Sequence, residues 1–258
     1  MLFRSLSSFR SGSIAEKLRE LEDLNFSGSI GGVFIIHTGR KDQAGLAGYA
    51  GKLKLYLLGR SREDVPNDRV NCVYFDDVKA GRLAYEHFFA RGHRRVLVFS
   101  GPPELTYFEK RERAFREAAG KNGCRFVFRN TREATPEDAY KLAGEFLGKR
   151  NASVTGVYVT AEVLLEGFLK RLDEEKIRVP GDLSLLSTND YLVAYQHEPP
   201  VSVVRTPHFE IGRLAAVVAL ENCAFEFDTR LDYRLDVLLN DRDSVADLGG
   251  AAERGGAV

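Results

Sequence analysis

The amino-acid sequence predicts an α/β fold of parallel sheets, and three observations support this prediction. Short apolar runs alternate along the chain with amphipathic helical stretches, which is the order found in doubly wound sheets. The apolar run at 96–99 (VLVF) shows no alternation with polar residues, which is typical of a strand covered on both faces. The helical stretch before it ends at Gly92, a residue suited to the left-handed position just past a helix.

The remaining elements follow from the same periodicities. A helix at 136–149 begins with a Thr135-Pro136-Glu137 cap, and the break at Gly101-Pro102-Pro103 is interpreted as a crossover between two lobes. Further helices are predicted at 13–26, 42–52, 79–91, 107–122, 162–175 and 208–223, and strands at 31–36, 54–59, 70–75, 125–128, 155–160, 183–187, 202–207 and 233–239.

The composition is that of an ordinary globular chain. Its 258 residues suffice for one large domain or two medium lobes. Lys plus Arg and Asp plus Glu number 37 each, so no bulk charge favours nucleic acid or an anionic membrane as a partner. No apolar run approaches the roughly 20 residues of a membrane span. Three scattered cysteines (Cys72, Cys124, Cys223) suggest buried thiols in a reducing compartment, and we expect a cytoplasmic protein.

Nothing in the sequence resembles a catalytic or metal-binding constellation. The five histidines have no metal-ligand spacing, and the chain has no glycine-rich phosphate loop and no nucleophile elbow. His93 lies at a helix-to-strand turn, where packing explains it better than catalysis. We therefore expect no enzyme activity, no cofactor and no metal.

Three ordered segments resemble the effector-binding core of LacI/GalR family transcription regulators, which has the fold of type I periplasmic binding proteins. The segments are 73–102, with its Asp-Asp turn and GHRRV strand, 177–215, with RVPGDLSLLSTND and the later PP and GR motifs, and the final strand 236–244. Residues 110–123 further match the family's R-x-x-G-F helix. The resemblance covers roughly residues 28–246.

The resemblance implies two Rossmann-like lobes with parallel sheets, joined by crossover segments. We expect a flexible N-terminus at 1–12, an N-terminal lobe at 13–101 plus 206–235, a C-terminal lobe at 102–205 plus 236–247, and a disordered tail at 248–258.

Two parts of the family pattern find no counterpart in this sequence. They are the N-terminal helix-turn-helix with its hinge helix, and the strand-helix-strand that opens the first lobe. We therefore expect a truncated first lobe with an unpaired sheet edge, and no DNA binding by this chain alone.

Arg111 occupies the arginine of the R-x-x-G-F motif. The resemblance implies that it points into the ligand cleft, where a planar guanidinium can bind hydroxyls or a carboxylate. The alternative is a solvated arginine on a highly charged helix. Lys79 has a similar pair of interpretations, because its position reaches the cleft in some family members.

Residues 187–190 (STND) stand where the family has GFDD. Asn189 is expected to contact ligand hydroxyls, and the alternative is an Asx turn at the end of a strand. For Asp190, a structural role near the crossover or the dimer interface is favoured over ligand contact.

Tyr158 aligns with an aromatic residue that stacks on the effector in several family members, although a strand tyrosine fits the core equally well. The next family motif, Ala-Asn-Asp, reads Thr160-Ala161-Glu162 here. Because Ala161 lacks the usual amide, Glu162 is the candidate to replace it.

Asp76 and Asp77 match the family's Asp-Asn turn. They are candidates either for ligand contact or for capping the helix that follows.

Together these features predict a small-molecule sensor. A sugar or related polar metabolite would bind between the lobes, and closure would alter the operator affinity of an intact regulator. A homodimer is expected through the helix at 79–91 and the segment at 191–200. Operator DNA is expected as a partner only through a DNA-binding domain that this sequence does not contain, and no membrane partner is expected. The alternative is a stand-alone or transport-type sugar-binding protein without a DNA role. A small α/β hydrolase or transferase is the remaining hypothesis, and no motif supports it.

Overall fold

A computed structural model describes two compact units. The described residues are 16, 18–19, 22, 32–36, 46, 48–50, 52–64, 69–120, 122, 124–149, 153–224 and 231–249, with the backbone alone at 223 and 224. Unit 1 comprises residues 1–76, 104–106 and 207–236, and unit 2 comprises 77–103, 107–206 and 237–258. The expected flexible N-terminus, most of the helices predicted at 13–26 and 42–52, and nearly all of the tail lie outside the described residues.

Unit 1 is built on a four-stranded parallel sheet in the order β1-β2-β3-β9. Its strands are β1 (Val33–Ile36), β2 (Leu55–Leu58), β3 (Val70–Phe75) and β9 (Asp232–Leu235). Helix α8 (His208–Ala224) packs on one face, where Tyr56 contacts the Val218 side of the helix. Leu55 and Leu57 face the opposite core, so both faces of the sheet are covered.

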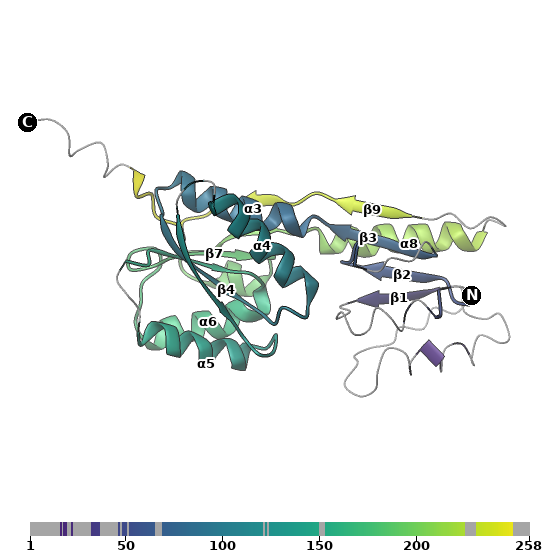
Figure 1. The fold of residues 1–258 in the computed structure, drawn as a ribbon, viewed down its shortest axis with the longest axis horizontal. Coiled ribbons are helices and arrows are strands. Elements are labelled where there is room, and N and C mark those ends of the chain that lie inside the picture. The colour runs from purple at the N-terminus through teal and green to yellow at the C-terminus, as the bar shows by residue number, and fades with distance from the viewer. Residues whose placement is uncertain are drawn as a thin grey trace, which may run out of the picture. The chain divides into compact units, whose positions relative to one another are not determined.

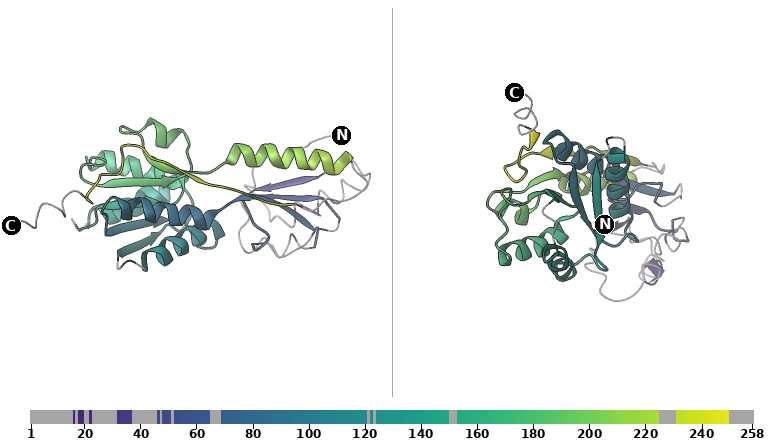
Figure 2. Two further views of the ribbon diagram at one scale, coloured as in Figure 1. Left: turned by 90° about the horizontal axis from the view of Figure 1, so that it is seen from above. Right: turned by 60° about the vertical axis from the view of Figure 1, so that its left-hand side comes forward.

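Unit 2 has a six-stranded sheet in the order β10-β8-β7-β6-β4-β5, in which only β10 is antiparallel. Helices α3 and α4 lie on one face of this sheet and α5 and α6 on the other (Figures 1 and 2). The strands are β4 (Arg95–Ser100), β5 (Arg125–Asn130), β6 (Gly156–Val159), β7 (Ser184–Thr188), β8 (Ser202–Arg205) and β10 (Leu238–Asn240), and the helices are α3 (Asp77–Ala90), α4 (Thr106–Gly120), α5 (Pro136–Leu147), α6 (Glu162–Glu174) and α7 (Leu192–Gln196).

The predicted α/β class with parallel sheets is therefore confirmed. The final predicted stretch, 233–239, forms two strands: β9 belongs to unit 1 and β10 to unit 2. The unit changes between Asp236 and Val237, one residue from the lobe boundary expected between 235 and 236.

The first crossover falls at Asp76–Asp77 and not at Gly101, where the sequence suggested it. The reason is strand pairing, because β4 lies between β5 and β6 in the second sheet. The Gly101 break instead allows a close approach to α4, since a Cβ atom at Gly101 would lie 2.1 Å from the Phe108 ring. The second crossover lies between Thr206 and Pro207, one residue from its expected place.

Helices α3 and α4 approach each other closely at Gly81. A Cβ atom at Gly81 would lie 2.1 Å from the carbonyl oxygen of Arg111, so only glycine fits there. Tyr85 and Phe115 pack edge to face across the same helix pair, with ring centroids 5.6 Å apart. This contact brings the first turn of α3 next to Arg111.

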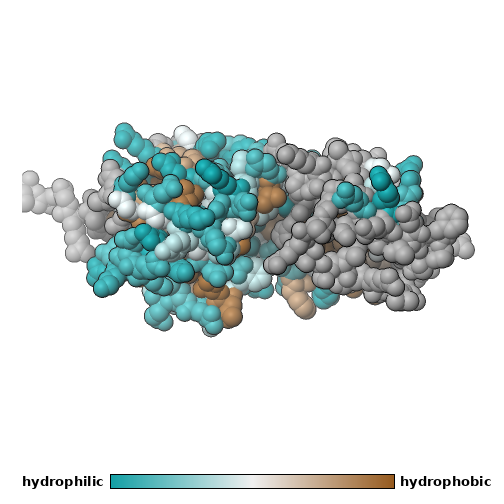
Figure 3. Space-filling model, turned by 90° about the horizontal axis from the view of Figure 1, so that it is seen from below, coloured by the Kyte–Doolittle hydropathy of each residue, from teal (hydrophilic) through white to brown (hydrophobic). Residues whose placement is uncertain are grey.

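One face of the described surface is mostly polar. Figure 3 shows one face on which hydrophilic residues predominate and hydrophobic areas are small and separate. No described helix is long and apolar enough to cross a membrane.

At the amino edge of the unit 2 sheet, two buried histidines connect α3 and β4 to the segment 241–249. His87 accepts a hydrogen bond from Arg91 at 3.0 Å, and its Nε2 lies 3.4 Å from Asp241 Oδ1. His93 donates from Nε2 to the Ala246 carbonyl at 3.0 Å. Gly92 adopts the predicted positive φ, 81°, beside residues 248 and 249.

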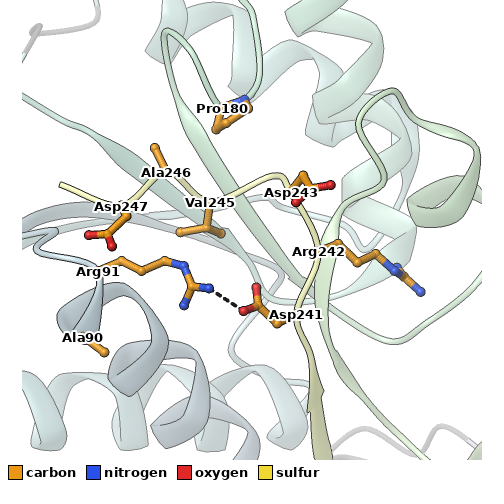
Figure 4. Close-up of a pocket in the computed structure, with 9 residues that line it drawn as sticks. All are labelled: Ala90, Arg91, Pro180, Asp241, Arg242, Asp243, Val245, Ala246 and Asp247. Atoms are coloured by element: carbon orange, nitrogen blue, oxygen red, sulfur yellow. Dashed lines mark hydrogen bonds and ion pairs between the residues drawn. The ribbon is translucent and has the colours of Figure 1, made fainter. Parts of the chain in front are cut away.

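The Arg91–Asp241 ion pair lies beside a cavity of about 590 Å³ at this edge (Figure 4). Burial lowers the pKa of His87 to about 4, helped by the Arg91 charge and opposed by Asp241. Burial also lowers the pKa of His93; Arg91 and Arg94 add to this, while the Ala246 carbonyl and Asp247 oppose it. Both histidines are therefore neutral near pH 7.

This arrangement predicts a specific acid sensitivity. Because the folded-state pKa of His87 lies below the usual 6.5, the unfolded chain binds more protons, and stability is lost as pH falls from about 6.5 toward 4. The loss from His87 should reach about 2 to 3 kcal/mol. Urea unfolding of His87→Gln at pH 7.5 and 4.5 should show a weaker pH dependence than wild type. His197→Gln, outside this cluster, should keep the wild-type dependence; equal slopes for all three proteins would contradict the prediction.

Candidate functional site

The candidate site lies at the carboxyl ends of the parallel strands of unit 2. In open α/β sheets, ligands bind outside this edge, where loops and helix N-termini converge. Here β4 ends at Ser100, β6 leads into Thr160, and β7 ends at Thr188. Asp77 comes to this edge from the start of α3, and Arg111 comes from α4.

Arg111 is the centre of a buried polar network. Its side chain is only 2% exposed, and its Nε donates to Asp77 Oδ1 at 2.8 Å. Its Nη1 donates to the carbonyl oxygen of Thr160, and its guanidinium lies 5.2 Å from the centre of the Tyr107 ring. The guanidinium thus joins α3, α4 and the end of β6. The solvated alternative for Arg111 does not fit this burial.

A row of hydroxyl groups continues from this network along the strand ends. The Thr160 hydroxyl donates to Ser100 Oγ at 2.9 Å, and the hydroxyls of Tyr158 and Thr188 are 2.6 Å apart. Burial raises the pKa of Tyr158 to about 12; the Arg111 charge and the Thr188 contact oppose this, and Asp77 adds to it. The Tyr158 ring is fully buried and stacks on Phe115, so its contacts are those of a core residue.

Asn189 and Asp190 follow β7. Asn189 adopts a left-handed backbone, with φ 78°, and its Oδ1 accepts a hydrogen bond from the Thr206 hydroxyl at 2.9 Å. Asparagine is among the few residues that tolerate this conformation. Asp190 accepts hydrogen bonds from Arg242 at 2.6 Å and from Asn240 at 3.0 Å, contacts that tie the β7 end to β10.

The other predicted site residues lie around this network. Glu162 begins α6 and is half-buried; burial raises the pKa of its carboxyl, and the nearby Glu166 raises it further. Lys79 is half-buried in the first turn of α3. Asp76 belongs to unit 1, where it pairs with Arg234 at 3.4 Å. The structure thus groups Arg111 with Tyr158, and places Asp76 with the residues of unit 1.

Sequence reasoning missed two contributors to the site. Asp77 was considered as a ligand contact or as a helix cap, and the structure shows it as the buried partner of Arg111. Thr131 follows β5 and is 5% exposed, yet its hydroxyl has no hydrogen-bond partner among the described residues. Its place directly after a strand was the available signal. In the described part of the chain, no three His, Cys, Asp or Glu side chains group to hold a metal.

Comparison with known families assigns the chain to a class. Residues 85–244 match the family model of the periplasmic binding protein-like domain, so the chain belongs to this family. The resemblance to the effector-binding core of LacI-type regulators, inferred from the sequence segments, is thereby confirmed.

Its sequence relatives are transcriptional regulators. The regulator CelR of Thermobifida fusca is 26% identical over 191 residues, which cover 73% of this chain and 56% of CelR. The regulator GntR of Pseudomonas aeruginosa PAO1 is 33% identical over 150 residues, covering 57% and 43% of the two chains. The chain spans about half the length of the curated relatives that it matches. The expectation that it is not an enzyme agrees with this set of relatives.

Solved structures share the fold. A LacI family regulator from Bifidobacterium animalis subsp. lactis superposes with a TM-score of 0.78 at 22% identity, covering 92% of this chain and 85% of the other. The complex of the regulator CelR with cellobiose gives 0.77 at 24% identity, covering 91% and 71%.

The Arg111–Asp77 pair should couple strongly in stability measurements. Arg111→Met leaves a buried carboxylate without its partner and should lower the free energy of unfolding by about 3 to 5 kcal/mol. Adding Asp77→Asn should restore part of the loss, because the uncompensated charge is then gone. Arg113→Ala, on the exposed side of α4, should change stability by less than about 1 kcal/mol. A double variant no more stable than Arg111→Met would refute the coupling.

Proposed function

We propose that this chain is the ligand-sensing core of a LacI/GalR-type regulator, and that it binds a sugar or a related small polar metabolite at the carboxyl edge of unit 2. The observation that supports this most directly is the buried Arg111–Asp77–Thr160 network, with further hydroxyl groups along the same strand ends. Preorganised donors and acceptors of this kind suit a ligand rich in hydroxyl groups.

The relatives support the same ligand class. CelR was solved with cellobiose, and a LacI family regulator from Enterococcus faecium, 21% identical to this chain, was solved with ribose. In the intact regulator, we propose that ligand binding changes the affinity for operator DNA, as a coupling between two binding sites.

Among the candidate residues, we propose Arg111, Asn189 and Glu162 as the ligand contacts. Arg111 presents a guanidinium that Asp77 and Thr160 hold in place, and Asn189 offers an amide that both donates and accepts. Tyr158 and Asp190 are proposed to support the site indirectly, because Tyr158 is hydrogen-bonded to Thr188 and Asp190 accepts a hydrogen bond from Arg242. Asp76 and Lys79 are proposed as flanking residues.

A ligand screen tests the function directly. Cellobiose, ribose, polyols, nucleosides and sugar phosphates should be tested by thermal shift; a ligand at about 100 times its Kd adds roughly 2.7 kcal/mol to stability. We expect at least one sugar or polyol to stabilise the protein. Stabilisation by none of these compounds would contradict the proposed function.

Asn189→Gly then tests the amide contact, because glycine accepts the positive φ and removes only the side chain. The variant should bind the identified sugar about five- to tenfold more weakly, which corresponds to one lost hydrogen bond. Lys176→Gly is a matched control, because Lys176 also has a positive φ, 55°, and lies in the exposed turn after α6. Equal affinity for Asn189→Gly and wild type in calorimetry would argue for a purely structural Asn189.

We further propose that the chain forms a homodimer through the exposed segment 191–200, with the helix at 79–91 contributing. Leu192 and Tyr195 on α7 are 66% and 65% exposed, and such adjacent apolar side chains commonly mark an interface. Leu192→Asp should shift the protein toward monomer in sedimentation at tens of micromolar. Leu220→Asp, which changes an exposed residue of α8 in unit 1, should leave the association unchanged. A wild-type protein that is monomeric throughout would exclude the dimer.

A further inference from the structure

We propose that the sugar site takes an uncharged ligand and rejects the anionic counterparts of that ligand, because the cation at its centre is already neutralised by the protein. The juxtaposition that supports this is the buried pair of Arg111 with Asp77 at the strand ends of unit 2. The inference rests on the proposed function and narrows its ligand class.

Arg111 and Asp77 form a closed ion pair. Their side chains are 2% and 7% exposed, and the Nε–Oδ1 distance of 2.8 Å is that of a charge-assisted hydrogen bond. The guanidinium also donates to the Thr160 carbonyl, so its donors are turned toward protein acceptors. A ligand carboxylate or phosphate at this position would meet a pair with no net charge.

The other cations at this edge are also engaged. Asp190, after β7, is paired with Arg242, which comes from the amino edge, at 2.6 Å, and both side chains are largely buried. Lys79 and Arg205 each have an interaction partner, and Arg132 is exposed to solvent, where its charge is screened. Among the described residues of unit 2 at this edge, no buried cation lacks an interaction partner.

What remains at the edge is acidic or neutral. The Glu162 carboxylate is half-buried and forms no ion pair or hydrogen bond with the described residues. Thr131 presents a buried hydroxyl that lacks a partner in the same part of the chain. An anion entering this edge would lose its hydration without gaining a counter-charge, which is costly. A ligand hydroxyl can instead donate to a carboxylate and accept from a threonine or the Asn189 amide.

Matched ligand pairs test the proposal on the wild-type protein. Calorimetry at one ionic strength compares cellobiose with cellobionic acid, ribose with ribose 5-phosphate, and glucose with glucuronic acid. For whichever pair binds, the uncharged member should bind at least about tenfold more tightly, the worth of one charge-assisted contact. Equal or tighter binding of the anionic member would overturn the inference and leave the proposed function standing. Binding of no member, charged or uncharged, would overturn both.

Asp77→Asn tests the cause. The substitution keeps the shape of the side chain and removes the charge that compensates Arg111, so the preference for the uncharged ligand should shrink about tenfold or more. Asp182→Asn is the matched control, because it removes the carboxylate of an exposed pair with Arg178, in which the nitrogen–oxygen distance of 2.9 Å is similar. The control should keep the wild-type preference. An unchanged preference in a folded Asp77→Asn variant would overturn the role of Asp77, and if that variant does not fold, the wild-type pairs decide.

Discussion

The buried ion pair between Arg111 and Asp77 is the interaction on which the organisation of unit 2 depends. It connects the first turn of α3 with α4, and through the Thr160 carbonyl it reaches the end of β6. The pair can form only because Gly81 lets the two helices approach, since any side chain there would collide with the Arg111 carbonyl. A charge pair this deep is tolerated when geometry and additional hydrogen bonds compensate for the lost hydration, and here both conditions are met.

The two edges of the unit 2 sheet differ in chemistry. The carboxyl edge carries the Arg111 network and a row of hydroxyls, which suits recognition of a polar ligand. The amino edge carries neutral, buried histidines that hold the segment after β10 against α3 and β4. Neutral imidazoles suit such a contact near pH 7, because each can donate one hydrogen bond and accept another without burying a charge. The two edges therefore carry separate groups of residues, a hydrogen-bonded polar network at one and neutral histidines at the other.

The chain belongs to the periplasmic binding protein-like family, and its sequence relatives are transcriptional regulators. In such a core, a ligand contributes through the difference in its affinity for two states of the protein. Because Asp77 neutralises Arg111, we propose that the site distinguishes ligands by the positions of their hydroxyl groups and not by their charge. The whole chain also carries no net charge, because it has 37 basic and 37 acidic residues. Its net charge therefore provides no electrostatic attraction to DNA.

The sequence by itself determined the α/β class, most element positions, the glycine stop at Gly92 and the family, because periodicity and ordered motifs are local properties of the chain. It also pointed to Arg111 through the R-x-x-G-F motif and to Asn189 at the end of a strand. Only the tertiary structure decided that β4 pairs in the second sheet and that Asp77 neutralises Arg111. The physical reason is that these features depend on which strands pair and which helices touch across 30 or more residues of sequence, and local patterns carry no information about such contacts.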